Sequence, residues 1–483
     1  MRPRSLIAAS VAALCGLLAF APIARAGNDY SDPEYARHDA DNVSRSSERQ
    51  FGEFTSPEYG SAFQFTAAET WLTAQANQIN DLRSGRLHGG LGQLLPGGAV
   101  GDPRQYHALT PIRIQFLSRT GAKLSGRIWG ADGTAKPGVV ITTGSIQGTE
   151  HMYWWAARTL VARGYEVMTW DVQGQGESES TGHAFGDTTP NGDGVPSQQN
   201  GNFYQGTIDA LRFFASTPGQ PYVPGTRTAA DVDAAKTTAA TTGEHLDWVN
   251  PGWAAYDHSR LGIAGHSLGA GAVSAVQACS DAKDYWKTLA LCEGQSFPIK
   301  AVIGWDALGG GAGVQPAVPG LNEQADGYFL NPTPAPNAPD ANSHLAAHNA
   351  WKAAGLDTFS LTIRGGTHLE WTQIPWILPA TNYGTKLADY YSALWFDRYV
   401  KGDPSATQQM IDGLTATGAN GDLNVAWNTH HFSTRYKSAY SLAGFGEVID
   451  LRAASGLSPV GDWAGSNADP VGAAGPDMVG NAS

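Results

Sequence analysis

Short apolar runs alternate with helix-like stretches along the middle of the chain. Residues 112–116 alternate apolar and polar positions, and residues 122–129 predict the second strand of a hairpin. Continuous apolar runs, typical of strands buried on both faces, follow at 138–142, 165–170, 261–264, 299–305 and 358–363. Helical patterns occur at 154–164, 203–215, 343–354 and 386–399. Strand, helix and strand at this spacing predict right-handed crossovers. We therefore expect an α/β fold with a doubly wound, mostly parallel sheet.

The ends of the chain differ from this middle part. Residues 1–26 combine Arg2 and Arg4, an apolar run and Ala24-Arg25-Ala26, which is typical of a secretory signal peptide. We interpret the rest as follows: 27–108 as an N-terminal extension, 109–403 as a catalytic domain with an insertion at 217–258, and 404–483 as a C-terminal extension. The aromatic end of the insertion predicts either an ordered piece over the site or a surface excursion.

Net charge limits the classes of partner that we expect, and the cysteines bear on the compartment. The 483 residues carry a formal net charge of −13, and removing the three arginines of the signal segment changes this to −16. This acidity argues against nucleic acid or an anionic membrane as partner. No later stretch predicts a membrane span, so we expect a secreted protein, extracellular or periplasmic. In that compartment Cys279 and Cys292 are expected to form a disulfide, with two buried thiols as the alternative.

The most informative motif follows the apolar run at 261–264. Gly265-His266-Ser267-Leu268-Gly269 fits G-x-S-x-G, and small residues that predict a helix come next. A serine between a strand and a helix lies on a sharp turn with its hydroxyl exposed, and the glycines are needed where strand and helix approach closely. Ser267 is therefore the candidate nucleophile.

A serine nucleophile needs a base and donors for the oxyanion. His368 follows the last clear core strand, in a loop that begins with Gly365-Gly366, and is the candidate base. The expected oxyanion donors are the backbone N–H of Leu268 and that of Ser145, which lies in the turn after the strand at 138–142.

Two carboxylates compete for the acid that orients the base. We favour Asp326, because a helix and a strand separate it from His368 in the usual order. Asp306 directly follows the strand at 299–305 and is the alternative. Its loop runs at once into glycines at 309–313, which offer little to hold a carboxylate still.

The span from about residue 111 to 403 resembles the α/β-hydrolases. It looks most like the bacterial cutinase-like polyester hydrolases and their dienelactone-hydrolase-like relatives. The matching pieces are Gly138–Gly148, Gly265–Gly269 and Gly366-Thr367-His368. In that family the residue matching Ser145 supplies an oxyanion donor, and the polyester hydrolases carry an aromatic there. The turn from Asp171 to Ser178 is similar instead to the D-x-x-G-x-G-x-S turn of general esterases and lipases.

These patterns predict a secreted serine hydrolase that cleaves carboxylic esters through an acyl-enzyme on Ser267. The expected substrate is a small-molecule or lipid-like ester, with Ile146, Trp305 and Trp371 as an apolar wall for it. An exported serine peptidase of the same fold and a non-catalytic binding protein on this scaffold are the alternatives. No cofactor is implied. His344 and His348 lie four apart on a predicted helix, but no Glu follows His344 as H-E-x-x-H requires, so we expect no metal site.

Overall fold

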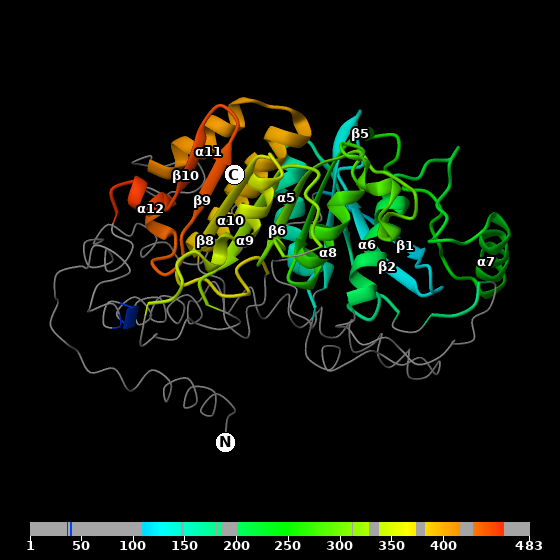
Figure 1. Ribbon diagram of the computed structural model, residues 1–483. Coiled ribbons are helices and arrows are strands. Elements are labelled where there is room, and N and C mark those ends of the chain that lie inside the picture. Colours follow the sequence, from blue (N-terminus) through cyan, green and yellow to red (C-terminus); the bar gives the residue numbers. More distant parts are fainter. Residues whose placement is uncertain are drawn as a thin grey trace, which may run out of the picture.

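The strands form one mixed sheet. The computed structural model describes residues 36, 39–40, 109–145, 149–179, 182–185, 200–311, 313–327, 338–372, 382–415 and 428–457. Within them the strand order is β1-β2-β4-β3-β5-β6-β7-β8-β9-β10 (Figure 1). The strands are β1 (Ile112–Leu117), β2 (Lys123–Trp129), β3 (Lys136–Thr142), β4 (Glu166–Trp170), β5 (Tyr256–His266), β6 (Ile299–Trp305), β7 (Gly320–Ala325), β8 (Thr358–Ile363), β9 (Ala439–Leu442) and β10 (Gly446–Ile449).

Only the centre of this sheet is parallel. Strands β4, β3, β5, β6, β7 and β8 run in the same direction, which makes five parallel pairs. The four remaining pairs, at the two edges, are antiparallel. The prediction of a mostly parallel sheet was therefore wrong. The difference arises because β1 and β2 form a hairpin at one edge, and β9 and β10 form another at the opposite edge. The second hairpin belongs to the segment predicted as a C-terminal extension, so the sheet continues past residue 403.

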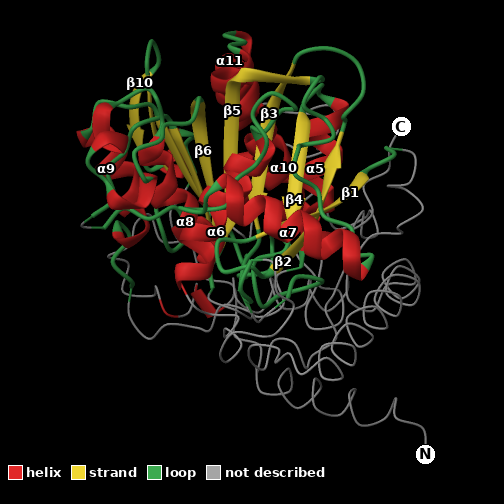
Figure 2. Cartoon of the chain, turned by 90° about the vertical axis from the view of Figure 1, so that its right-hand side faces the viewer, coloured by secondary structure: helices red, strands yellow, loops and turns green. Residues whose placement is uncertain are grey.

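Helices cover both faces of the sheet, as an α/β protein requires (Figure 2). Val139 and Ile141 of β3 belong to one core cluster with residues of two helices, α5 (Trp154–Ala162) and α10 (Asn382–Phe396). Val140 belongs to a second cluster on the other face, which three helices cover: α6 (Asn200–Phe214), α8 (Leu268–Val276) and α9 (Ala346–Ala353). The described residues also contain the α-helices α7 (Ala229–Thr242), α11 (Ser405–Thr415) and α12 (Leu451–Ala454). In the described ranges, no helix combines the length and the apolar character that crossing a membrane requires.

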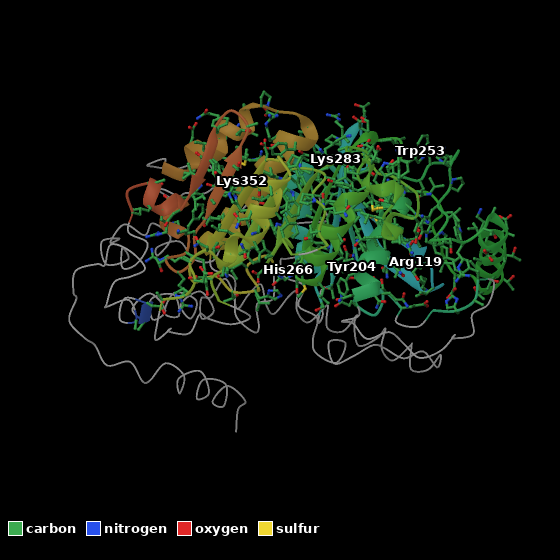
Figure 3. All side chains as sticks on the ribbon, viewed as in Figure 1. Arg119, Tyr204, Trp253, His266, Lys283 and Lys352 are labelled. Atoms are coloured by element: carbon green, nitrogen blue, oxygen red, sulfur yellow. A yellow bond between two sulfur atoms is a disulfide. The ribbon has the colours of Figure 1, made fainter. Side chains whose placement is uncertain are left out.

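The insertion at 217–258 packs at the edge where the parallel strands begin. Its Asn250 donates a hydrogen bond to Glu166, the first residue of β4, at 2.9 Å. Trp253 lies just before β5, whereas His266 is the last of the 11 residues of that strand. Figure 3 accordingly shows Trp253 and His266 on opposite sides of the molecule. Because Ser267 follows His266, the aromatic end of the insertion is a surface excursion and not a cover over Ser267.

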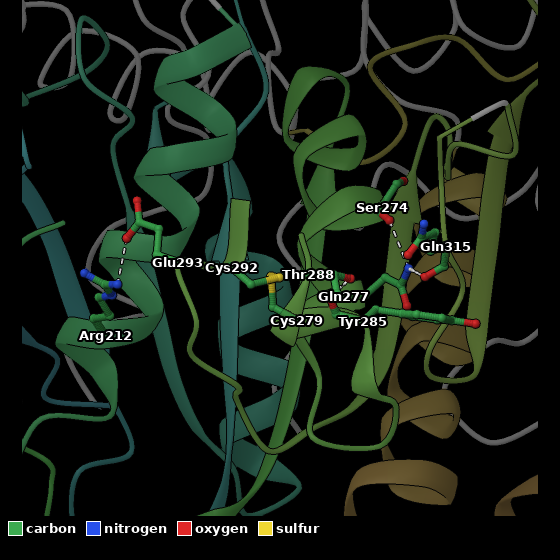
Figure 4. Close-up of a disulfide and its surroundings, with 9 residues drawn as sticks. All are labelled: Arg212, Ser274, Gln277, Cys279, Tyr285, Thr288, Cys292, Glu293 and Gln315. Atoms are coloured by element: carbon green, nitrogen blue, oxygen red, sulfur yellow. Dashed lines mark hydrogen bonds and ion pairs between the residues drawn. A yellow bond between two sulfur atoms is a disulfide. The ribbon is translucent and has the colours of Figure 1, made fainter. Parts of the chain in front are cut away.

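A disulfide closes the loop between α8 and β6. Cys279 and Cys292 are bonded, with their Cα atoms 5.4 Å apart, which confirms the predicted pair (Figure 4). Glu293, next to Cys292, forms an ion pair with Arg212 of α6 at 2.7 Å. The bridge therefore fixes a loop that also anchors α6.

Candidate active site

Ser267 occupies a sharp turn between β5 and α8. Its φ of 55° and ψ of −120° lie in a region that non-glycine residues rarely adopt. A Cβ at Gly265 would approach the carbonyl oxygen of Gly269 to 2.3 Å, and one at Gly269 would approach that of Thr143 to 2.4 Å. Only glycine fits at these two positions, so the motif spacing is a packing requirement. Ser267 itself is half-buried.

His368 lies beside this serine. Its Nε2 is 2.9 Å from the Oγ of Ser267, although 101 residues separate them in the sequence. β5 and β8 are parallel strands of one sheet, so the residues that follow their carboxyl ends meet at the same edge. The predicted nucleophile and the predicted base are thus in hydrogen-bond contact.

The carboxylate that meets His368 is Asp306, not Asp326. Oδ2 of Asp306 lies 2.5 Å from Nδ1 of His368. Since a carboxylate accepts hydrogen bonds, Nδ1 carries the proton and Nε2 is left to accept one from Ser267. The expectation that Asp326 would orient the base is corrected by this contact.

Asp306 is also held more firmly than its glycine-rich surroundings suggested. Its Oδ1 accepts a hydrogen bond from the backbone N–H of Ala325 at 2.9 Å, and its own N–H donates to the carbonyl of Glu323 at 2.8 Å. Both partners belong to β7, the strand next to β6. The neighbouring strand, rather than the loop after β6, therefore fixes the carboxylate.

Asp326 instead supports the loop that carries His368. Its Oδ2 accepts a hydrogen bond from the N–H of Gly365 at 3.0 Å, and its Oδ1 accepts one from Ser433 at 2.5 Å. Gly327 donates to the carbonyl of Gly366 at 2.9 Å in the same region. Asp326 thus ties the start of the histidine loop to the end of β7 and to the C-terminal segment.

The two predicted oxyanion donors lie on adjacent segments at this edge. Leu268 is the first residue of α8, where helix N–H groups lack partners within the helix and carry partial positive charge. Gly144, which precedes Ser145, packs so closely against His266 that a Cβ would lie 2.8 Å from the Nδ1 of that histidine. Ser145 and Leu268 are both half-buried, like Ser267.

The expected apolar wall is not where it was predicted. Trp305 and Trp371 are fully buried. The indole N–H of Trp305 donates to Ser392 at 3.0 Å, and that of Trp371 donates to Glu323 at 2.6 Å. Ser392 in turn donates to Glu323 at 3.1 Å. Both tryptophans are therefore core residues beneath the site, and the prediction that they line the substrate wall is corrected. The physical cause is the buried polar network, in which Ser392 and Glu323 accept hydrogen bonds from their indoles. Ile146, the third predicted wall residue, lies outside the described residues.

Glu323 forms the centre of that network. Burial raises its pKa well above the usual glutamate range, while the hydrogen bonds from Trp371 and Ser392 oppose the shift. Because Glu323 also supplies the carbonyl that holds Asp306, this buried residue joins the core to the contact between Asp306 and His368.

Three further polar residues at the site escaped the sequence analysis. His266 is buried, and burial together with the neighbouring His368 lowers its pKa well below the usual histidine range. Its Nε2 lies 2.8 Å from the backbone carbonyl oxygen of His368, and its Nδ1 lies 2.9 Å from the hydroxyl of Tyr153. Gln175 donates to the carbonyl of Gly144 at 2.7 Å. The available signals were the histidine inside G-x-S-x-G and the glutamine inside the turn at 171–178, but neither spacing implies these contacts.

Metal ligands do not gather in the part of the chain that the structure describes. No group of three or more His, Cys, Asp or Glu side chains there is arranged to hold a metal ion. His344 stacks on Tyr436, with ring centroids 3.7 Å apart, and contacts Thr362 through Nδ1. His348 contacts Glu447 instead. The two histidines therefore have separate structural partners.

The comparisons with known proteins assign no family. No protein-family model matches the chain, and no curated protein matches its sequence. The geometry of the site is therefore the basis on which a function can be proposed.

Proposed function

We propose that this protein is a secreted serine hydrolase of the α/β-hydrolase fold that cleaves carboxylic esters. The observation that carries the proposal is the chain of contacts Ser267 Oγ, His368 Nε2, His368 Nδ1, Asp306 Oδ2, with Ser267 on a strained turn. A nucleophile, a base and an orienting acid in this order are the parts that acyl transfer requires. The signal-like segment at 1–26 and the bridge between Cys279 and Cys292 support export.

The geometry supports a two-step reaction. Ser267 Oγ attacks the ester carbonyl carbon while its proton passes to Nε2 of His368. The tetrahedral intermediate collapses, the bond to the alcohol oxygen breaks, and His368 returns the proton to the leaving alkoxide. Water then repeats the sequence on the acyl-enzyme, which releases the carboxylic acid and restores Ser267. Asp306 stabilises the imidazolium that forms in each half-reaction.

The negative charge on the intermediate is stabilised by backbone donors. Leu268 is the first residue of α8, where the helix dipole is positive, and Ser145 lies in the loop after β3, so their backbone N–H groups are the proposed donors. Donors of this kind act on charge that develops only in the transition state, so they raise kcat rather than tighten substrate binding.

One panel of substrates tests the proposal. We expect the protein to hydrolyse p-nitrophenyl esters of short and medium acids, and Ser267→Ala to abolish this turnover. Aminoacyl-anilides report the peptidase alternative in the same assay. Turnover of anilides in preference to esters would replace the ester assignment by a peptidase. Turnover of neither substrate would leave a binding protein on this scaffold.

A further inference from the structure

Both backbone polar groups of Gly144, the residue before Ser145, are bonded by buried side chains. Gln175 Nε2 donates to the Gly144 carbonyl at 2.7 Å, and the Gly144 N–H donates to the Tyr153 hydroxyl at 2.9 Å. Gln175 and Tyr153 are both buried. In a planar trans peptide the C=O of one residue and the N–H of the next point in opposite directions. The bond from Gln175 to Gly144 therefore sets the direction of the Ser145 N–H.

Gln175 is itself fixed by a rigid turn. Asp171, directly after β4, accepts hydrogen bonds from the N–H groups of Glu150 and Glu177 at 2.7 and 2.8 Å. Its backbone carbonyl accepts one from the hydroxyl of Ser178 at 2.7 Å. The turn from Asp171 to Ser178 therefore presents Gln175 to the loop after β3 with little freedom to move.

Tyr153 continues the chain of bonds toward the base. A carbonyl oxygen only accepts hydrogen bonds, so His266 Nε2 carries the proton that it donates to the backbone of His368. The other ring nitrogen, Nδ1, then accepts the proton of the Tyr153 hydroxyl, whose oxygen accepts the Gly144 N–H. Burial keeps this tautomer neutral, because it lowers the pKa of His266 and raises that of Tyr153. In this series of hydrogen bonds, from Gly144 through Tyr153 and His266 to the backbone of His368, each donor meets an acceptor.

We propose that Gln175 and Tyr153 are positioning residues that orient the Ser145 N–H toward the oxyanion and connect this donor, through His266, to the loop of His368. The inference rests on the proposed function, since it assigns a role to residues around the same triad. Neither side chain contacts the reacting atoms. Their effect passes through the two peptide planes that flank Gly144 and through the imidazole ring of His266.

Substitutions at Gln175 separate positioning from packing. Gln175→Leu keeps the volume and removes the donor, so we expect kcat for a p-nitrophenyl ester to fall about ten- to a hundredfold, with KM almost unchanged. Gln175→Glu donates to Gly144 only while its carboxyl is protonated. The ratio of its kcat to that of wild type, measured at each pH, should therefore rise as the pH falls.

Gln277 provides the matched control. This buried glutamine also bonds backbone groups, donating to Gln315 at 2.8 Å and accepting from Ala317 at 2.7 Å, but it lies beyond the end of α8 (Figure 4). Gln277→Leu should lower the melting temperature and leave kcat near that of wild type. If Gln175→Leu reduces kcat no more than this control, the positioning role is wrong.

Tyrosine-to-phenylalanine variants provide an independent test, because each substitution removes one hydroxyl and little volume. Tyr153→Phe should lower kcat, because the Gly144 N–H and His266 Nδ1 both lose their partner. Tyr222→Phe is the control, since the buried Tyr222 hydroxyl donates to the carbonyl of Leu117 at 2.7 Å, away from the triad. Equal kcat for both variants, or a flat pH ratio for Gln175→Glu, would overturn the inference while wild-type turnover keeps the proposed function. A wild type without turnover would instead reject the proposed function.

Discussion

Asp306 and His368 meet across the end of a strand to which neither belongs. Asp306 follows β6, His368 follows β8, and β7 lies between these strands in the sheet. The two side chains nevertheless approach to 2.5 Å. The carboxylate spans this gap because the N–H of Ala325, the last residue of β7, bonds its second oxygen. β7 thus holds the Asp306 carboxylate in place through its backbone.

The first prediction separates the two aspartates. Asp306→Asn should reduce kcat about 10³- to 10⁴-fold, because an amide donor facing Nδ1 stabilises the wrong tautomer of His368. Asp326→Asn removes only support for the histidine loop, so we expect a loss of no more than about tenfold together with lower stability. Kinetics and thermal melting of the two variants, measured side by side, check this. A larger loss in Asp326→Asn would return the acid to Asp326.

The sequence predicted the parts of this site that depend on local chain geometry. The G-x-S-x-G turn was predictable because the sharp strand-to-helix turn that it encodes is a local feature, and Gly265 is required by the nearby Gly269, although Gly269 itself is required by the distant Thr143. The place of His368 was predictable because chain order fixes which loop follows the last core strand. The order of the two aspartates along the chain, in contrast, does not show that the side chain of Asp306 can extend past the end of β7 to meet His368.

Contacts between distant segments limited the rest of the prediction. Trp305 and Trp371 are apolar residues near the site in the sequence, yet Ser392 and Glu323 bind their indoles in the core. The hairpin of β9 and β10 could not be placed because its antiparallel pairing with β8 joins segments about 80 residues apart. Gln175 likewise meets Gly144 only once β3 and β4 are neighbours.

The second prediction concerns the buried tryptophans. Trp371→Phe removes the indole N–H that Glu323 accepts, and it should destabilise the fold by about 1–3 kcal/mol. The preference among p-nitrophenyl esters of increasing acyl length should stay as in wild type. Thermal unfolding and an acyl-length series measure the two effects. A changed preference with unchanged stability would place Trp371 on the substrate wall after all.

The third prediction concerns the disulfide. Joining Cys279 to Cys292 closes a short loop, so replacing both cysteines by alanine should cost about 3 kcal/mol of unfolding free energy. Thiol titration of the unfolded but unreduced protein, purified from the exported fraction, should detect no free thiol. Two free thiols in that material would contradict the bridge.

The fourth prediction concerns Glu166, which is buried at the edge of the sheet opposite the triad. Burial raises its pKa to about 8, although the hydrogen bond from Asn250 and the charge of Lys136 oppose the shift. Because the folded-state pKa lies above the unfolded value of about 4.5, its contribution to stability is complete below pH ~4.5. That contribution is lost as the pH rises toward 8.

Glu166→Gln removes this titration. The variant should therefore gain stability relative to wild type between pH 5 and pH 9, by an amount on the order of a few kcal/mol. Urea unfolding of both proteins across this pH range measures the difference. A difference that does not change with pH would show that Glu166 titrates near its ordinary value in the folded protein.

The most direct test of the central claim is covalent labelling of the nucleophile. A fluorophosphonate reacts with a serine whose hydroxyl is activated by a neighbouring base and whose product is stabilised by an oxyanion site. Peptide mass spectrometry after labelling should locate the adduct on Ser267 alone, and His368→Ala should slow its formation by several orders of magnitude. An adduct on another serine, or no adduct under conditions in which a known serine esterase reacts fully, would contradict the assignment.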